Sequence, residues 1–276
     1  MMRKLIKSLV VSKDLESHID KMPKEVGSRG YDAWGFNSDI NKIGVALFKQ
    51  LYDHYFRVEA DGLENIPKDG PCLIIANHSG QLPLDGTLIG VAMEMNKHAP
   101  RAPRAMIERF FPTVPFLGNF LNSVGAVIGD PLNCAKMLQR GEAVIVFPEG
   151  IRGSGKLYSK RYQLQRFGNG FMHLAMKYNA PIIPVGVVGC EETIPAIANI
   201  KPLAKLLHVP YVPIALPFVL PAKVHLNFGK PMYFGNDSLE DEREVTEQEV
   251  TKQVEQVKSS IRALINKGLA ERKRIF

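Results

Sequence analysis

From residue 71 onward, short apolar runs alternate with longer stretches whose apolar residues recur at helical spacing. The apolar runs have the length of buried strands and are too short for helices. The predicted strands are Cys72–Ala76, Val124–Ile128, Ala143–Phe147, Ile182–Val188 and Val224–Phe228. The predicted helices between them are Gly86–Asn96, Asn133–Gln139 and Phe171–Tyr178. This alternation predicts an α/β fold, in which a mixed central sheet is flanked by helices.

Helical patterns also mark both flanks of this region. Apolar residues recur at helical spacing through Asp39–Phe56, with Ser38 as the expected N-cap, whereas residues 1–36 are mostly polar and irregular. Near the other end, Thr246 and Glu249 form a capping-box pattern that begins an amphipathic helix, which we expect to pack on the sheet. We therefore divide the chain into an N-terminal helical extension, residues 1–55, and a main domain, residues 56–276.

Composition limits the class of protein and of partner. The chain has 276 residues, of which 45% are hydrophobic and 23% charged, as in globular proteins. Its net charge of +7 suits an anionic membrane surface, a phosphorylated substrate or nucleic acid, without choosing among them. Cys72, Cys134 and Cys190 lie beside apolar or helix-like segments and are expected to be buried free thiols in a reducing compartment. We find neither a signal-peptide pattern nor an apolar run long enough to span a bilayer, and we expect a cytoplasmic protein.

The first chemically informative segment is NHSGQLPLDG, residues 77–86, which directly follows a predicted strand. Functional groups in open α/β sheets gather outside the carboxyl ends of strands. Pro83 suits a helix start, which places Asp85 in the first helical turn. The carboxylate of Asp85 can then hold one ring nitrogen of His78 and leave the other as a general base. The alternative is a solvated loop histidine and an aspartate that only caps the helix.

The second segment is VFPEGIRGSGK, residues 146–156, which also follows a predicted strand. Its glycines permit close approach of the backbone, and the cations of Arg152 and Lys156 can bind a phosphate. The run from Gly150 to Lys156 matches the first part of a Walker A loop. However, Leu157 stands where a Ser or Thr would hold Mg²⁺, which argues against a nucleotide-binding loop. The alternative is an ordinary basic surface loop.

Together these segments resemble the glycerolipid (lysophospholipid) acyltransferase family, whose bacterial members include 1-acylglycerol-3-phosphate acyltransferase. Two further blocks match in order, Phe116–Asp130 and APIIPVGVVG at residues 180–189, and the resemblance covers residues 56–235. It implies an acyltransferase domain over residues 56–276. It also implies direct transfer of a fatty acyl group, without an acyl-enzyme, from acyl-CoA or acyl-carrier protein to a glycerolipid hydroxyl. The expected acceptor is 1-acylglycerol-3-phosphate, which would give phosphatidic acid.

The resemblance also implies roles for single residues. His78 is expected to take the hydroxyl proton and Asp85 to stabilise the imidazolium that forms. The residues expected to bind the acceptor are Glu149, Gly150, Arg152 and Lys156. An alternative role for Glu149 is to position the loop by bonding its backbone. The oxyanion needs donors, which backbone N–H groups near Ser79 or near Gly150 could supply.

Two departures from the family pattern bear on these roles. Four residues usually separate the histidine and the aspartate of the motif, whereas six separate His78 from Asp85. The family's second block usually ends in an arginine, and none stands at residues 128–130. Phosphate binding would then depend on Arg152, Lys156 or cations elsewhere. The other candidate cations for phosphate binding are Arg101, Arg104 and Arg109, which flank a further predicted strand, Ala105–Ile107.

Other acceptors are open as alternatives, namely another lysophospholipid, a diacylglycerol or a glycolipid. A non-catalytic lipid-binding protein on the same fold is an alternative of a different class. We expect no metal, because the histidines are dispersed, and no cofactor besides the acyl donor. The expected partners are the donor thioester, the lipid acceptor and a membrane surface, without nucleic acid.

The apolar, proline-rich segment Leu206–Pro221 is either a buried loop or a patch that enters the cytoplasmic face of the membrane. Met1–Lys13 is a second candidate for membrane contact.

Overall fold

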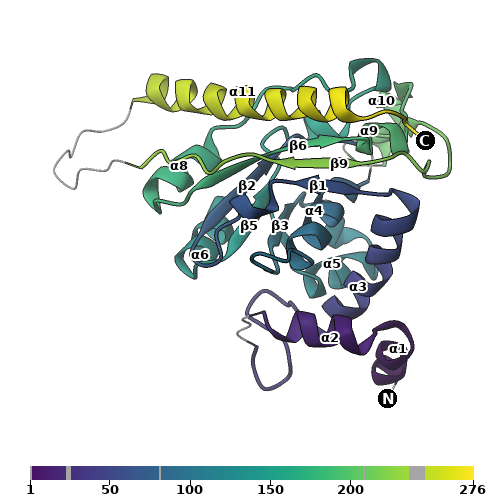
Figure 1. The fold of residues 1–276 in the computed structure, drawn as a ribbon. Coiled ribbons are helices and arrows are strands. Elements are labelled where there is room, and N and C mark those ends of the chain that lie inside the picture. Colours follow the sequence, from purple (N-terminus) through teal and green to yellow (C-terminus); the bar gives the residue numbers. More distant parts are fainter. Residues whose placement is uncertain (1, 23–25, 81, 208, 210, 236–245) are drawn as a thin grey trace.

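A computed structural model describes residues 2–22, 26–80, 82–207, 209, 211–235 and 246–276. Within these residues seven strands form the central sheet, in the order β1-β9-β6-β2-β5-β3-β4 (Figure 1). The strands are β1 (Glu59–Asp61), β2 (Cys72–Ala76), β3 (Arg104–Ile107), β4 (Ala126–Ile128), β5 (Ala143–Val146), β6 (Ile182–Val188) and β9 (His225–Phe228). All neighbouring pairs are parallel except β6 and β9, which are antiparallel. The predicted mixed sheet is therefore confirmed.

Helices cover both faces of the sheet (Figure 1). One face is covered by α6 (Pro131–Gln139), α8 (Gly170–Lys177) and α11 (Glu247–Glu271). The other face carries α4 (Leu84–Glu94), beside which lie α3 (Ser38–Gln50) and α5 (Leu117–Ser123). The side chains of β2 alternate between the two layers, as they must in a strand buried on both sides. Leu73 and Ile75 join the core under α11, whereas Cys72 and Ile74 join the core under α4.

The sequence patterns located these elements well. The bounds of β2 and β6 are as predicted, and the other predicted strands and the helices between them differ from the structure by one or two residues at one or both ends. The capping box at Thr246 is present, and α11 packs on β6 as expected. The three cysteines are free and buried. The very short strand β1 was not predicted.

The N-terminal part differs from its sequence pattern. Residues 1–36 have an irregular pattern, but the structure contains α1 (Met2–Val10) and α2 (Lys13–Asp20) there. The N-cap of α3 is Asn37, whose side chain accepts a hydrogen bond from Ile40 N, so the prediction of Ser38 is wrong by one residue. The last turn before Phe56 is a π-helical turn, η1 (Leu51–Tyr55). Helices this short are only marginally stable by themselves in water, so tertiary contacts stabilise them here. Lys7 of α1 pairs with Glu16 and Asp39.

Shorter elements fill the connections. They are η2 (Leu63–Asn65), η3 (Phe111–Thr113), α7 (Ile151–Ser154), η4 (Tyr158–Lys160), α9 (Cys190–Thr193), α10 (Lys201–Leu206) and a two-stranded ribbon of β7 (Ala198–Asn199) with β8 (Pro213–Ile214). The ribbon and α10 lie in the proline-rich part of the chain. Proline restricts regular elements there, because it lacks a backbone N–H.

The close packing of α11 on β6 depends on Gly186. A Cβ atom at this position would lie 2.7 Å from the backbone of Leu264 and Ile265, so the helix would have to move away. We expect Gly186→Ala to lower the free energy of unfolding by about 1–3 kcal/mol, the usual cost of overpacking a core. Urea unfolding curves measure this change.

Gly170, the first residue of α8, provides the matched control. Nothing lies within 4 Å of a Cβ atom added there, so Gly170→Ala should change the unfolding midpoint little. If both variants unfold at the midpoint of the unaltered protein, α11 does not pack on β6 as closely as the structure indicates.

Candidate functional site

Two neighbouring strand ends bring the sequence motifs together. β2 and β5 are parallel neighbours, with Ile75 opposite Val146, and both strands therefore end at the same edge of the sheet. The loop after β2 carries His78, and the turn after β5 carries Glu149. Adjacent carboxyl ends of strands form the usual ligand site of open α/β sheets.

His78 and Asp85 are in direct contact despite the longer spacing between them. Oδ2 of the fully buried Asp85 lies 2.6 Å from Nδ1 of His78 and accepts a hydrogen bond from Ser79 N at 2.8 Å. The ring of His78 stacks on the ring of Phe147, with 4.4 Å between their centroids. Because the carboxylate accepts the proton on Nδ1, Nε2 carries the lone pair of the neutral ring. The geometry is that of an oriented general base.

The charges around His78 favour its imidazolium form. Burial by itself lowers the pKa of His78, but the attraction and hydrogen bond of Asp85 raise it, and the carboxylates of Glu149 and Glu108 raise it further. The net result is a pKa above the ordinary value of 6.5. A raised pKa makes the neutral ring a stronger base, and the same carboxylates stabilise the ring after it has taken a proton.

Glu149 joins the two loops. Its side chain is buried, with Oε1 accepting a hydrogen bond from His78 N at 2.9 Å and Oε2 accepting one from Gln165 N at 2.7 Å. Its carboxylate therefore bonds backbone groups, which matches the alternative role that the sequence left open. The neighbouring Gly150 has φ 54 and ψ −143, a conformation that favours glycine. Gly153 also needs to be small, because an added Cβ atom would lie 2.7 Å from Cβ of His78.

Lys156 is enclosed rather than exposed. Its Nζ donates to Oε1 of Glu191 at 2.9 Å and lies 3.6 Å from Oε2 of Glu149, and its side chain is only 4% exposed. Burial raises the pKa of the Glu191 carboxyl, and the ammonium of Lys156 opposes that rise. Lys156 thus neutralises two buried carboxylates that would otherwise repel each other.

The contacts of Glu191 extend toward the C-terminus. Oε2 of Glu191 accepts a hydrogen bond from Tyr162 N, and the hydroxyl of Tyr162 accepts one from Gly189 N. The adjacent Glu192 forms a buried ion pair with Arg272, the residue that follows α11. A network of paired buried charges therefore underlies the site.

The other cations expected near the acceptor have separate positions. Arg152 is exposed and donates to Arg166 O at 3.3 Å. Arg109 is 78% exposed and lies 3.5 Å from Asp130. Arg101 bonds backbone carbonyls, and Arg104 pairs with Asp32 and Glu142 near the amino-terminal ends of the strands. The structure therefore does not bring Arg101 and Arg104 to the site.

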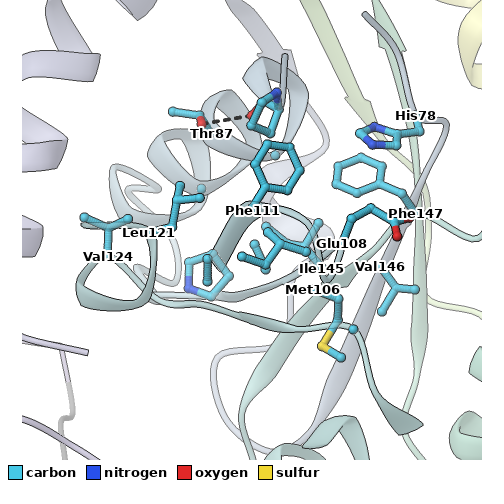
Figure 2. Close-up of a pocket in the computed structure, with 18 of the residues that line it drawn as sticks. His78, Thr87, Met106, Glu108, Phe111, Leu121, Val124, Ile145, Val146 and Phe147 are labelled. Carbon is cyan, nitrogen blue, oxygen red and sulfur yellow. Dashed lines mark hydrogen bonds between the residues drawn. The ribbon is translucent and has the colours of Figure 1, made fainter. Parts of the chain in front are cut away.

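A cavity of about 770 Å³ opens beside His78 (Figure 2). This volume is within the range of small-molecule sites, roughly 300–1,000 Å³. Its walls come from α3, α4, α5, β3 and β5, and they are mainly apolar. Apolar residues that line it include Val45, Phe48, Val91, Phe111, Leu121 and Ile145. Because α3 belongs to the N-terminal extension, that extension forms part of the cavity wall.

Sequence reasoning missed several residues of the site. The side chain of Asn77 exchanges two hydrogen bonds with the backbone of Val187 and so prolongs the pairing of β2 with β6 toward His78. Phe147 stacks on His78, and Glu108 lines the cavity after the end of β3. Glu108 could have been found, because it directly follows the predicted strand Ala105–Ile107. Asn77 and Phe147 lie within the recognised motifs, but nothing in the sequence shows their contacts.

Some backbone donors of the site are already used. His78 N donates to Glu149, Ser79 N donates to Asp85, and Gly150 N donates to Phe147 O. An oxyanion would therefore need other N–H groups of these loops. Within the described ranges, no cluster of three or more His, Cys, Asp or Glu residues could hold a metal ion.

Comparisons with known proteins agree on one family. A family model described as Acyltransferase matches residues 57–188, which include both motifs. An uncharacterized protein of Mycobacterium tuberculosis (strain ATCC 25618 / H37Rv) is 36% identical over 265 residues, covering 91% of this chain and 72% of that protein. The human protein named "DGAT1/2-independent enzyme synthesizing storage lipids" is 26% identical over 215 residues, covering 76% of this chain and 61% of that protein.

A solved structure has the same fold. It is the crystal structure of the 1-acyl-sn-glycerophosphate (LPA) acyltransferase PlsC from Thermotoga maritima, with a TM-score of 0.57 and 20% sequence identity. The match covers 86% of this chain and 80% of the PlsC chain, so it includes much more than the strands that carry the site.

The enclosure of Lys156 leads to a prediction about stability. Lys156→Met leaves the carboxylates of Glu149 and Glu191 buried without a cation, and we expect a loss of about 3–5 kcal/mol of unfolding free energy near neutral pH. The pKa of Glu191 is already raised, and losing the ammonium raises it further. A protonated Glu191 needs no cation, so the loss should shrink as the pH falls. Thermal unfolding at several pH values measures this.

Arg152→Gln is the matched control, because Arg152 is an exposed cation of the same loop. Its unfolding should differ little from that of the unaltered protein at any of these pH values. A Lys156→Met variant as stable as Arg152→Gln would show that Lys156 does not neutralise the two carboxylates.

Proposed function

The chain belongs to the glycerolipid acyltransferase family, and on that premise we propose that it transfers a fatty acyl group from a thioester to a glycerolipid hydroxyl. The observation that carries this proposal is the His78–Asp85 pair beside a large apolar cavity. The pair suits proton removal from a hydroxyl, and the apolar walls suit a fatty acyl chain. A lipid-binding protein without catalysis would need the cavity but would have no use for an oriented base.

The proposed reaction is a direct transfer. The acceptor hydroxyl gives its proton to Nε2 of His78 while its oxygen attacks the thioester carbonyl carbon. The tetrahedral intermediate then collapses, the carbon–sulfur bond breaks, and the imidazolium returns the proton to the departing thiolate. Asp85 holds the ring through Nδ1, and Phe147 limits its tilt by stacking. We propose acyl-CoA or acyl-carrier protein as the donor and no further cofactor.

The first candidate acceptor is 1-acylglycerol-3-phosphate, which would give phosphatidic acid. The name of the Thermotoga maritima protein supports it, and so do the exposed cations of Arg152 and Arg109. In this proposal Glu149 and Gly150 shape the loop at the acceptor, and Arg152 meets the phosphate. Lys156 is enclosed and does not contact the acceptor itself. It neutralises the carboxylate of Glu149, which shapes the loop.

The second candidate is an acceptor without a phosphate, such as diacylglycerol. The name of the human relative, which refers to the synthesis of storage lipids, is compatible with it. The structure adds a specific observation, because Lys156, one of the two cations in the glycine-rich motif, is paired with Glu191 inside the protein. A phosphate-binding loop usually keeps its cations accessible to the ligand.

We also propose that the protein works at a membrane surface, on the cytoplasmic face. No helix in the described parts of the chain is long and apolar enough to span a bilayer. The described residues between 197 and 218 form an apolar surface segment that exposes large side chains, and Lys205 beside them is also exposed. The exposed apolar residues are Ile197, Ile200, Leu206, Leu207, Ile214, Leu216 and Phe218. Val209 of this segment lines the cavity, which would connect the membrane with the site.

The N-terminal contact candidate lies elsewhere. Leu9 of α1 is 76% exposed, but Figure 1 shows α1 and α10 at opposite ends of the molecule. α1 therefore does not lie on the same surface as residues 197–218, and membrane contact through that segment does not depend on α1.

The proposed mechanism predicts the behaviour of two variants. His78→Ala should lower kcat by about 10²–10⁴-fold, as is usual when a general base is removed. Asp85→Asn should also lower kcat strongly, because an amide has no charge to stabilise the imidazolium and its NH2 group cannot accept a hydrogen bond where the second carboxylate oxygen now does. Asp85 raises the pKa of His78, so Asp85→Asn should also move the acid limb of the kcat/KM profile to lower pH.

The assay uses radiolabelled 1-acylglycerol-3-phosphate and diacylglycerol with acyl-CoA and with acyl-carrier protein, read by lipid chromatography. Unfolding curves show whether each variant is folded. A folded His78→Ala variant with near-normal turnover would contradict the mechanism, and a protein that binds lipid but acylates none would favour the non-catalytic alternative.

The membrane proposal predicts a separate pair of effects. The double variant Leu216→Ser with Phe218→Ser should reduce binding to anionic vesicles by about tenfold or more, because two exposed apolar side chains no longer enter the lipid. Its melting temperature should change little, since both side chains are about half exposed. Vesicle flotation and a melting curve on the same protein measure the two effects.

Two single variants serve as controls. Tyr233 is 68% exposed but lies after β9, outside the segment, so Tyr233→Ser should float like the unaltered protein. Val219 is half-buried against the core under α4, so Val219→Ser should lower the melting temperature instead. Unchanged flotation of the double variant would reject residues 197–218 as the membrane contact.

A further inference from the structure

Glu108 is a cavity-lining carboxylate to which the proposed mechanism gives no contact with the acceptor. It directly follows β3, whose carboxyl end lies at the same edge of the sheet as the ends of β2 and β5. Its side chain lines the cavity together with His78 and Phe147 (Figure 2). Oε1 of Glu108 lies 3.3 Å from the position that a Cβ atom of Gly150 would take. Glu108 therefore faces the glycine that the family pattern assigns to the acceptor.

The other two carboxylates near His78 are committed to the protein itself. Asp85 accepts hydrogen bonds from His78, Ser79 and Gly86, and Glu149 accepts from His78 N and Gln165 N. Within the described ranges, the carboxylate of Glu108 has neither a hydrogen bond nor an ion pair. A half-buried carboxylate without donors has its full acceptor capacity left for a ligand.

The charges of the site are arranged in two zones. The carboxylate of Glu108 stands in the cavity. Arg109 also lines the cavity, but its side chain is 78% exposed and lies 3.5 Å from Asp130, and Arg152 is exposed and is not among the lining residues. Exposed cations suit the phosphate groups of a polyanionic donor such as acyl-CoA. The part of the cavity around Glu108 suits a different ligand. A phosphate monoester there would meet a like charge, whereas a hydroxyl could donate a hydrogen bond to the carboxylate of Glu108.

We propose that Glu108 selects the acceptor, by accepting a hydrogen bond from a second free hydroxyl of an uncharged glycerolipid and by repelling a phosphate monoester. The acceptor class is a neutral glycerolipid with two neighbouring hydroxyls, such as a monoacylglycerol. One hydroxyl reacts at Nε2 of His78, and the other donates to Glu108. This inference rests on the proposed acyl transfer and narrows its acceptor, because it favours an uncharged glycerolipid over 1-acylglycerol-3-phosphate.

The test compares three acceptors that differ at one position. Monoacylglycerol offers a second hydroxyl, diacylglycerol offers none, and 1-acylglycerol-3-phosphate offers a phosphate. In Glu108→Gln we expect kcat/KM to fall about tenfold for monoacylglycerol, because a neutral amide is a weaker acceptor than a carboxylate. We expect it to rise about tenfold for 1-acylglycerol-3-phosphate, since the repulsion is gone, and to change less than about threefold for diacylglycerol.

Glu64→Gln is the control variant, since Glu64 is an exposed glutamate of η2 outside the cavity, and it should leave all three values unchanged. Equal changes for all three acceptors in Glu108→Gln would overturn the proposal, because they would mean that Glu108 supports only the structure or the base. An unaltered protein that prefers 1-acylglycerol-3-phosphate to monoacylglycerol would also overturn it.

A binding measurement separates this inference from the proposed function. Monohexanoylglycerol and its 3-phosphate are titrated into the full chain, and the ring signals of His78 are followed by NMR. We expect the neutral probe to bind more tightly than the phosphate, and Glu108→Gln to reverse that order. If no acceptor is acylated by the unaltered protein with either donor, the acyl-transfer proposal fails, and the order of binding still decides the role of Glu108. The same order in both proteins would overturn that role.

Discussion

The hydrogen bonds of the Glu149 carboxylate hold the candidate site together. One oxygen accepts from the backbone of the loop after β2 and the other from Gln165 N, so a single buried side chain sets the distance between loops far apart in sequence. A buried carboxylate is costly unless cations and donors surround it. Lys156 supplies the cation, and Glu191 in turn holds Lys156. The position of His78 therefore depends on a chain of paired charges beneath it.

The same arrangement determines the chemistry of His78. Its ring is fixed by Asp85 on one edge and by Phe147 on one face, which leaves little rotational freedom to lose when a substrate binds. The surrounding carboxylates raise the pKa of His78 against the effect of burial. In the proposed proton transfer, the folded protein would thus already stabilise the positive charge that develops on the ring, as preorganised electrostatics requires.

One of the N-terminal helices, α3, forms part of the cavity wall. Val45 and Phe48 of α3 line it, Asn41 bonds the buried Glu94 of α4, and His18 of α2 bonds the backbone of Glu94. A division of the chain at residue 56 therefore separates residues that share one cavity wall. The division is still a prediction about sequence segments, but the cavity depends on both of them.

The sequence by itself determined the strands, the flanking helices and the pair His78–Asp85, because periodicity, capping and a short loop are local properties. It could not show that Lys156 is enclosed, since its partner Glu191 stands 35 residues away in sequence. The two residues come together only because the strands that precede them, β5 and β6, lie on either side of β2 in the sheet. Nor could it show that Arg101 and Arg104 lie away from the site or that Glu108 lies in it. Which charges are paired, exposed or left without a partner depends on desolvation and distance between segments remote in the chain, and only the tertiary structure decides those.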